Sequence, residues 1–150
     1  MKRISMFRIQ LTKTGSFLFD FNVIRTPKDA EVISRQYFNH CYDGLPDREV
    51  FGILWLNTKN VVIGCETVSI GTVNASLVHP REVFKSGILH NSTSFVCFHN
   101  HPSGFADPSP EDISITRRLQ EVGTLLGIEL LDHIILSDDS YTSMQKQGLF

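Results

Sequence analysis

Two dense apolar runs, separated by a short polar turn, constrain the fold of this chain most strongly. Residues 50–56 and 61–70 are each long enough for a strand, and the turn Asn57-Thr58-Lys59-Asn60 between them has the length of a hairpin loop. A hairpin joins antiparallel neighbours, whereas parallel neighbours need a crossover of roughly a dozen residues or more. The sequence therefore predicts two antiparallel core strands.

Helical patterns alternate with further strand patterns along the rest of the chain. Three helices are expected, each opening with a polar residue followed by proline: 26–41, 79–89 and 109–127. Other strands are expected over residues 4–24 (one or two strands turning near Gly15), 95–98 and 128–136, with a turn and a short tail after them. A hairpin interleaved with helices predicts a mixed β-sheet with helices packed on it, either α+β or α/β-like.

Length and composition indicate one ordinary globular domain over residues 1–150, with residues 1–46 forming N-terminal strands and a helix of that domain. The chain has 150 residues, of which 41% are hydrophobic and 20% charged, so it can bury a stable core without needing disulfides or metals to stabilise the fold. Its net charge of −2 supplies no overall positive field for a polyanion, which makes nucleic acid an unfavoured partner.

Three further features concern the compartment. No stretch approaches the ~18 uninterrupted apolar residues of a membrane span. Charged and polar residues interrupt the N-terminal region, which therefore does not read as a signal peptide. The three cysteines are odd in number and contain no CxxC pair. We therefore expect a reduced protein in the cytoplasm, with no membrane partner.

One polar loop has a spacing with chemical meaning. If the strand over 95–98 stays extended, His99 and His101 point to the same face, and Pro102 favours that extended geometry. Asp112, in the first turn of the next helix, can then turn back as a third ligand beside the two imidazoles. Three protein ligands and one open position are typical of a catalytic zinc site. The alternative is a simple capping box, in which Ser109 caps the helix and Asp112 reaches back.

The same residues carry a family resemblance. His99-Asn100-His101, seven residues, Ser109, two residues and Asp112 resemble the JAMM signature of the JAB/MPN metallohydrolases. The run HNHPSG followed by PSPED is similar to the RadC-like branch of that group. Further matching pieces follow the same order: Gly71-Thr72-Val73-Asn74, His79-Pro80-Arg81-Glu82 and Leu130-Leu131-Asp132-His133-Ile134-Ile135.

The resemblance covers residues 47–150 and implies a single RadC-like MPN domain. We expect the free-standing form, without the helix-hairpin-helix region found upstream in full-length RadC proteins. The implied architecture is α+β of the three-layer α/β/α type, a mixed sheet flanked by helices as in cytidine deaminases.

The resemblance also assigns roles to individual residues. His99, His101 and Asp112 would hold Zn²⁺, and Ser109 would stabilise the oxyanion or orient the bound water. The general base would be a glutamate at the start of an early core strand, where Glu49 fits best and Glu66 is the rival. The implied reaction is hydrolysis of a peptide or isopeptide bond in a peptide or protein substrate.

Cys97 and His133 lie within or beside the matching motifs, and each has a structural interpretation. Cys97 precedes His99 by two residues and would face the same way, but a cysteine in an apolar strand is expected to be a small core residue. His133 is expected to be buried and hydrogen-bonded, with a role behind a metal ligand as the alternative. The rival function is a non-enzymatic DNA-repair or mobile-element accessory protein that keeps a zinc site, although Lys and Arg are scattered, with a mild pair at Arg117-Arg118, and do not form the basic stripe of a DNA-binding surface.

Overall fold

The computed structural model describes residues 1–71 and 78–150. Within them, three helices and five strands follow one another in this order: α1 (Pro27–Tyr42), β1 (Glu49–Leu56), β2 (Val62–Gly71), α2 (Pro80–Leu89), β3 (Ser94–Asn100), α3 (Pro110–Leu126), β4 (Glu129–Leu136) and β5 (Tyr141–Ser143).

The strands form one mixed sheet in the order β2-β1-β3-β4-β5. β1 is antiparallel to both β2 and β3, β3 is parallel to β4, and β4 is antiparallel to β5. The predicted hairpin is therefore confirmed as β1 and β2. The parallel pair β3 and β4 is joined through α3, as the crossover requirement of parallel strands demands.

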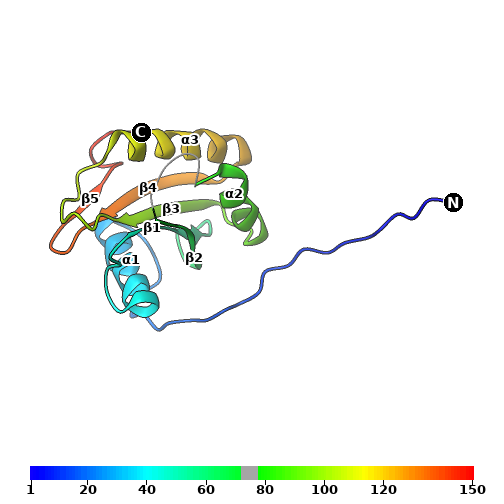
Figure 1. Ribbon diagram of the computed structural model, residues 1–150, viewed down its shortest axis with the longest axis horizontal. Helices are drawn as coiled ribbons and strands as arrows, with labels where there is room; N and C mark the ends of the chain where they lie inside the picture. The colour runs from blue at the N-terminus through cyan, green and yellow to red at the C-terminus, as the bar shows by residue number, and fades with distance from the viewer. Residues whose placement is uncertain (72–77) are drawn as a thin grey trace.

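Helices cover both faces of this sheet, as Figure 1 shows, with α1 on one side and α2 and α3 on the other. On the α1 side, Phe38 belongs to the same buried cluster as Leu54 and Phe98. On the opposite side, Leu119 of α3 belongs to the cluster that contains Trp55. Alternate residues of β1 thus enter two different cores, and the predicted α+β architecture with three layers is confirmed.

The predicted helix starts are also confirmed. Thr26 and Ser109 each form a capping box, with Asp29 and Asp112 as the acidic third residues. His79 caps α2 by accepting a hydrogen bond from the backbone N–H of Arg81. In all three cases the following proline costs no helical hydrogen bond, because the first turn has no partner for its N–H.

Two predicted segments differ from the structure. The strands expected over residues 4–24 are wrong: the structure has an isolated bridge there between Val23 and Val61, and the N-terminal segment runs away from the body of the domain (Figure 1). The side chains of Ile4 and Phe7 are 91% and 90% exposed, so the first part of this segment has no core to face. Phe17, Phe19 and Phe21 do pack against the cluster that contains Phe38, but they do so without forming a strand. β5 was expected only as tail, since three residues are too short to show a period.

Of the segment Gly71-Thr72-Val73-Asn74, residues 72–74 lie outside the described residues. Among the residues that are described, no helix is long and apolar enough to cross a bilayer.

Candidate metal centre

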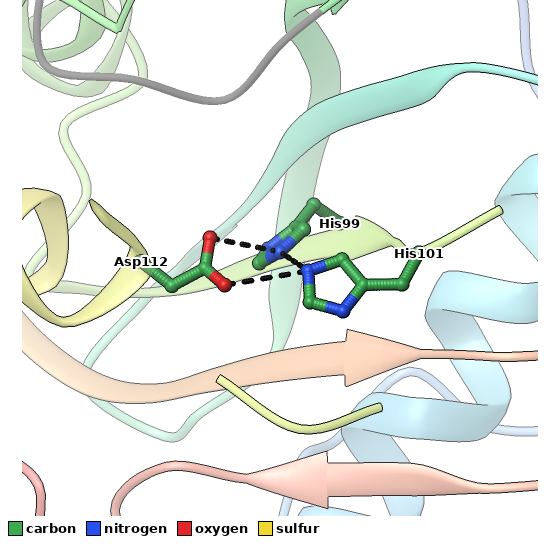
Figure 2. A group of neighbouring side chains, drawn as sticks. All are labelled: His99, His101 and Asp112. Carbon is green, nitrogen blue, oxygen red and sulfur yellow. Dashed lines mark hydrogen bonds and ion pairs between the residues drawn. The ribbon is translucent and has the colours of Figure 1, made fainter. Parts of the chain in front are cut away.

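Two histidines and one aspartate converge at the end of β3 (Figure 2). Nε2 of His99 lies 3.2 Å from Oδ1 of Asp112, and Nε2 of His101 lies 3.3 Å from Oδ2 of the same carboxylate. The two Nε2 atoms are 2.9 Å apart. One ligand atom from each residue lies within 4.8 Å of the others, which is close enough for all three to bind one ion.

Strand geometry places the two histidines. His99 is on β3, opposite Phe51 of β1, and its side chain is fully buried. The N–H of His101 donates to the carbonyl of Leu136 at 2.7 Å, which keeps the chain alongside β4 beyond the last residue of β3. The two side chains therefore stay on one face, as their spacing predicted.

Helix capping places the aspartate. Oδ2 of Asp112 accepts a hydrogen bond from the backbone N–H of Ser109 at 2.8 Å, while Oγ of Ser109 accepts one from the N–H of Asp112 at 3.1 Å. The two interpretations of this pair are therefore compatible, because one carboxylate both completes the capping box and faces the histidines. The cap fixes the direction in which the carboxylate points.

The electrostatics of the group fit a cation. Burial opposes ionisation of Asp112, but its close contacts with His101 and His99 outweigh it and hold the pKa of this carboxyl well below its usual range. The hydrogen bond that His101 makes to Asp112 raises the pKa of His101, against the opposing effect of burial. The carboxylate is thus anionic at neutral pH and attracts a positive charge to the two imidazoles.

The hydrogen bond behind His101 shows which ring nitrogen is free. Nδ1 of His101 lies 2.9 Å from the carbonyl oxygen of Phe105, which can only accept, so this nitrogen carries the proton. When both ring nitrogens are protonated, Nε2 donates to Asp112; in the neutral ring, Nε2 has a lone pair that can bind a cation held beside the carboxylate. Two imidazole nitrogens and a carboxylate with an orienting contact behind the ring are a donor set that zinc favours.

Comparison with known proteins places this site in a family. A family model described as "RadC-like JAB domain" matches residues 24–149. The chain belongs to the RadC family. The predicted family membership is thereby confirmed.

Several curated relatives of this RadC-like chain are similar over most of its length. A UPF0758 protein of Shouchella clausii is 52% identical over 129 residues, which are 85% of this chain and 54% of that protein. The UPF0758 protein YsxA of Bacillus subtilis is 48% identical over 126 residues, 84% of this chain and 52% of that protein. The chain thus spans about half the length of the curated relatives it matches.

The two glutamates that compete for the role of base occupy different places in the RadC-like domain. Glu49 begins β1 on the same face as Phe51, the strand partner of His99, and the charge of Glu49 contributes to the raised pKa of His101. Oε1 of Glu66 instead accepts a hydrogen bond from Nε1 of Trp55 at 2.9 Å. The sheet therefore brings Glu49 towards the candidate metal donors, whereas Glu66 contacts the core tryptophan.

Ser109 lies at the rim of the same site. It is half-buried at the start of α3, next to the proposed ligand Asp112 in space through their reciprocal hydrogen bonds. Oγ acts as the acceptor in that pair, so its own proton remains for a donor role. This geometry suits a hydroxyl that assists bound substrate.

The other two residues singled out from the RadC-like motifs lie behind the site. Cys97 is fully buried in the core, where burial raises the pKa of its thiol, and it is not among the three converging donors found in the described residues. His133 is also fully buried, and burial lowers its pKa. Its Nε2 lies 2.8 Å from Nδ1 of His99, so the expected buried, hydrogen-bonded histidine is confirmed.

Sequence reasoning missed two polar residues that contact this RadC site. Asn100, which lies between the two histidines in the sequence, is buried, and its side chain accepts a hydrogen bond from the backbone N–H of Val50 at the start of β1. Thr116 is buried one helical turn after Asp112 and contacts His133. A threonine four residues after the candidate ligand Asp112 was a usable signal, because residues i and i+4 share a helix face. The asparagine gave none beyond its place in the HNH run.

Proposed function

We propose that this chain is a zinc-dependent hydrolase of the JAMM type that cleaves peptide or isopeptide bonds. Its ligands are His99, His101 and Asp112. The observation that carries the proposal is the convergence of two imidazole nitrogens on one anionic carboxylate within 4.8 Å, at the end of a core strand. The exposed or half-exposed free thiols Cys41 and Cys65 fit a reducing compartment, and we place the protein in the cytoplasm.

The residues of the chain divide the work of hydrolysis. When bound, zinc supplies Lewis-acid activation of water and of the scissile carbonyl. Glu49 takes the proton from the attacking water and delivers it to the leaving amine, since a carboxylate can serve as base and then as acid. The hydroxyl of Ser109 donates a hydrogen bond to the oxygen on which negative charge develops.

Paired measurements of zinc and turnover test this proposal. Zinc content is measured by elemental analysis, and hydrolysis is measured on a peptide library that includes lysine isopeptides. The wild type should hold one zinc and cleave a member of the library. His99→Ala should lose zinc and hydrolysis together, whereas Glu49→Gln should keep zinc and lose hydrolysis.

Glu66→Gln is the matched control, since its amide oxygen can still accept the hydrogen bond from Trp55. It should retain both zinc and turnover. Stoichiometric zinc in His99→Ala would overturn the ligand assignment. Full turnover in Glu49→Gln would overturn the assignment of the base, and loss of turnover in Glu66→Gln alone would transfer the role to that residue.

A further inference from the structure

A chain of buried hydrogen bonds extends from the back of His99 into α3. Nδ1 of His99 lies 2.8 Å from Nε2 of His133, and Nδ1 of His133 lies 2.6 Å from Oγ1 of Thr116. Oγ1 of Thr116 is in turn 2.5 Å from the backbone carbonyl oxygen of Asp112. The side chains of His99, His133 and Thr116, which we call the relay, are fully buried, so water does not substitute for any of these partners.

The last contact fixes the direction of every proton in this relay. Two oxygens 2.5 Å apart need a proton between them, and a carbonyl can only accept, so Thr116 donates to Asp112. A hydroxyl has one proton, which means that Nδ1 of His133 must donate to Thr116. Nε2 of the neutral His133 ring is then an acceptor, and Nδ1 of His99 must donate to it.

The opposite direction would disable the site. If Thr116 donated to His133, Nε2 of His133 would carry the proton, Nδ1 of His99 would accept it, and Nε2 of His99 would be protonated. A protonated ring nitrogen has no lone pair for a metal. The direction of the relay thus decides whether His99 is a ligand or a hydrogen-bond donor.

We propose that Thr116 and His133 are positioning residues that set the tautomer of His99, so that its Nε2 lone pair faces the metal. This inference rests on the proposed metal site. Because Thr116 donates to the residue that supplies the third ligand, one hydroxyl ties the tautomer of His99 to the helix turn that carries Asp112. Outer partners of this kind raise the affinity of a ligand for its metal and hold its ring in orientation.

The tautomer can be read without any variant. Long-range ¹⁵N–¹H NMR spectra of the uniformly labelled, metal-free full chain distinguish protonated from bare imidazole nitrogens. We expect a proton on Nδ1 and none on Nε2 for His99, and the same pattern for His133. A proton on Nε2 of His133 in the wild type would overturn the relay.

A matched pair of variants tests its effect on the metal. Thr116→Val keeps the shape of the side chain and removes the hydroxyl, whereas Thr116→Ser keeps the hydroxyl. Zinc affinity is measured by competition with a chromophoric chelator, and the ligand field by the absorption spectrum of the Co²⁺-substituted protein. We expect the valine variant to bind zinc about 10- to 100-fold more weakly with an altered cobalt spectrum, and the serine variant to resemble the wild type.

Each outcome has one meaning. Equal zinc affinity in the valine and serine variants would overturn the relay while leaving the metal site intact. Failure of the wild type to bind zinc would overturn the proposed function, whereas the NMR result on the metal-free chain would stand. If urea titration shows that Thr116→Val is unfolded, a second pair of variants replaces it. His133→Gln keeps an acceptor for His99 in its Oε1, and it should retain more zinc affinity than His133→Leu, which has none.

Discussion

The side chain of Asn100 binds the backbone on both sides of Glu49. Its Oδ1 accepts a hydrogen bond from the N–H of Val50 at 2.9 Å, and its Nδ2 donates to the carbonyls of Arg48 and Pro46, each at 2.9 Å. Asn100 is 1% exposed, so these contacts are shielded from water. The residue between the two proposed histidine ligands therefore holds the segment that carries the proposed base.

Replacing this asparagine should weaken the fold. Asn100→Ala leaves the N–H of Val50 without its partner in a buried strand, together with two carbonyls. We expect a loss of about 2–4 kcal/mol in the free energy of unfolding, measured by urea titration. Asn39→Ala on the exposed side of α1 is the control and should change it by less than about 0.5 kcal/mol. Equal effects of both substitutions would contradict the role given to Asn100.

Zinc should stabilise the folded chain. A ligand that binds only the native state at a free concentration of 100 times its Kd adds about 2.7 kcal/mol. For a domain of this size that corresponds to a rise in Tm of about 5–10 °C. Differential scanning fluorimetry with and without zinc measures the shift, and an unchanged Tm of the wild type would count against the metal site.

The two capping boxes supply a matched pair for this measurement. Asp112 and Asp29 have the same capping role, but only Asp112 faces the histidines. Asp112→Asn should lose most of the zinc-dependent shift in Tm, because the anionic ligand is gone. Asp29→Asn should keep the shift, although its Tm without zinc will also fall. A similar loss of the shift in both variants would show that helix capping, rather than ligation, governs the response.

Local signals predicted much of this fold and its site. The hairpin and the three capped helices depend on residues close in sequence, and the structure confirms them. The spacing of the His-x-His pair is also local, and the structure brings its two side chains together with Asp112. The choice between Glu49 and Glu66 depends on pairing across strands, which aligns Phe51 with His99 and Ile53 with Glu66. No local pattern contains that register.

The relay behind His99 shows the same limit more sharply. It needs His133 beside His99, which depends on the parallel pairing of β3 with β4, and it needs Thr116 of the crossover helix in contact with His133. The failed strands over residues 4–24 show the converse. Phe17, Phe19 and Phe21 alternate and pack against the core, but a strand also needs a continuous pairing edge, and the structure has an isolated bridge there between Val23 and Val61.

Close packing at Gly52 should make this glycine hard to replace. A Cβ added there would lie 2.3 Å from Cζ of the Phe98 ring, which is fully buried beneath α1. Because a packed ring cannot move aside freely, Gly52→Ala should lower the free energy of unfolding by about 1–3 kcal/mol in urea titrations. Gly15→Ala, which meets nothing within 4 Å, should stay within about 0.5 kcal/mol of the wild type. A tolerated alanine at position 52 would mean that β1 and β3 do not pack as closely as described.

The three thiols should differ in reactivity in the folded chain. Cys41 is exposed, whereas burial, with smaller contributions from the charges of Cys41 and Glu66, raises the pKa of Cys65 to about 11. Burial raises the pKa of Cys97 as well. Only the thiolate reacts with iodoacetamide, so at pH 8 we expect modification of Cys41 well before the other two, as followed by peptide mass spectrometry. Unfolding in urea should bring the three rates together. Modification of Cys97 at the rate of Cys41 without denaturant would contradict its burial in the core.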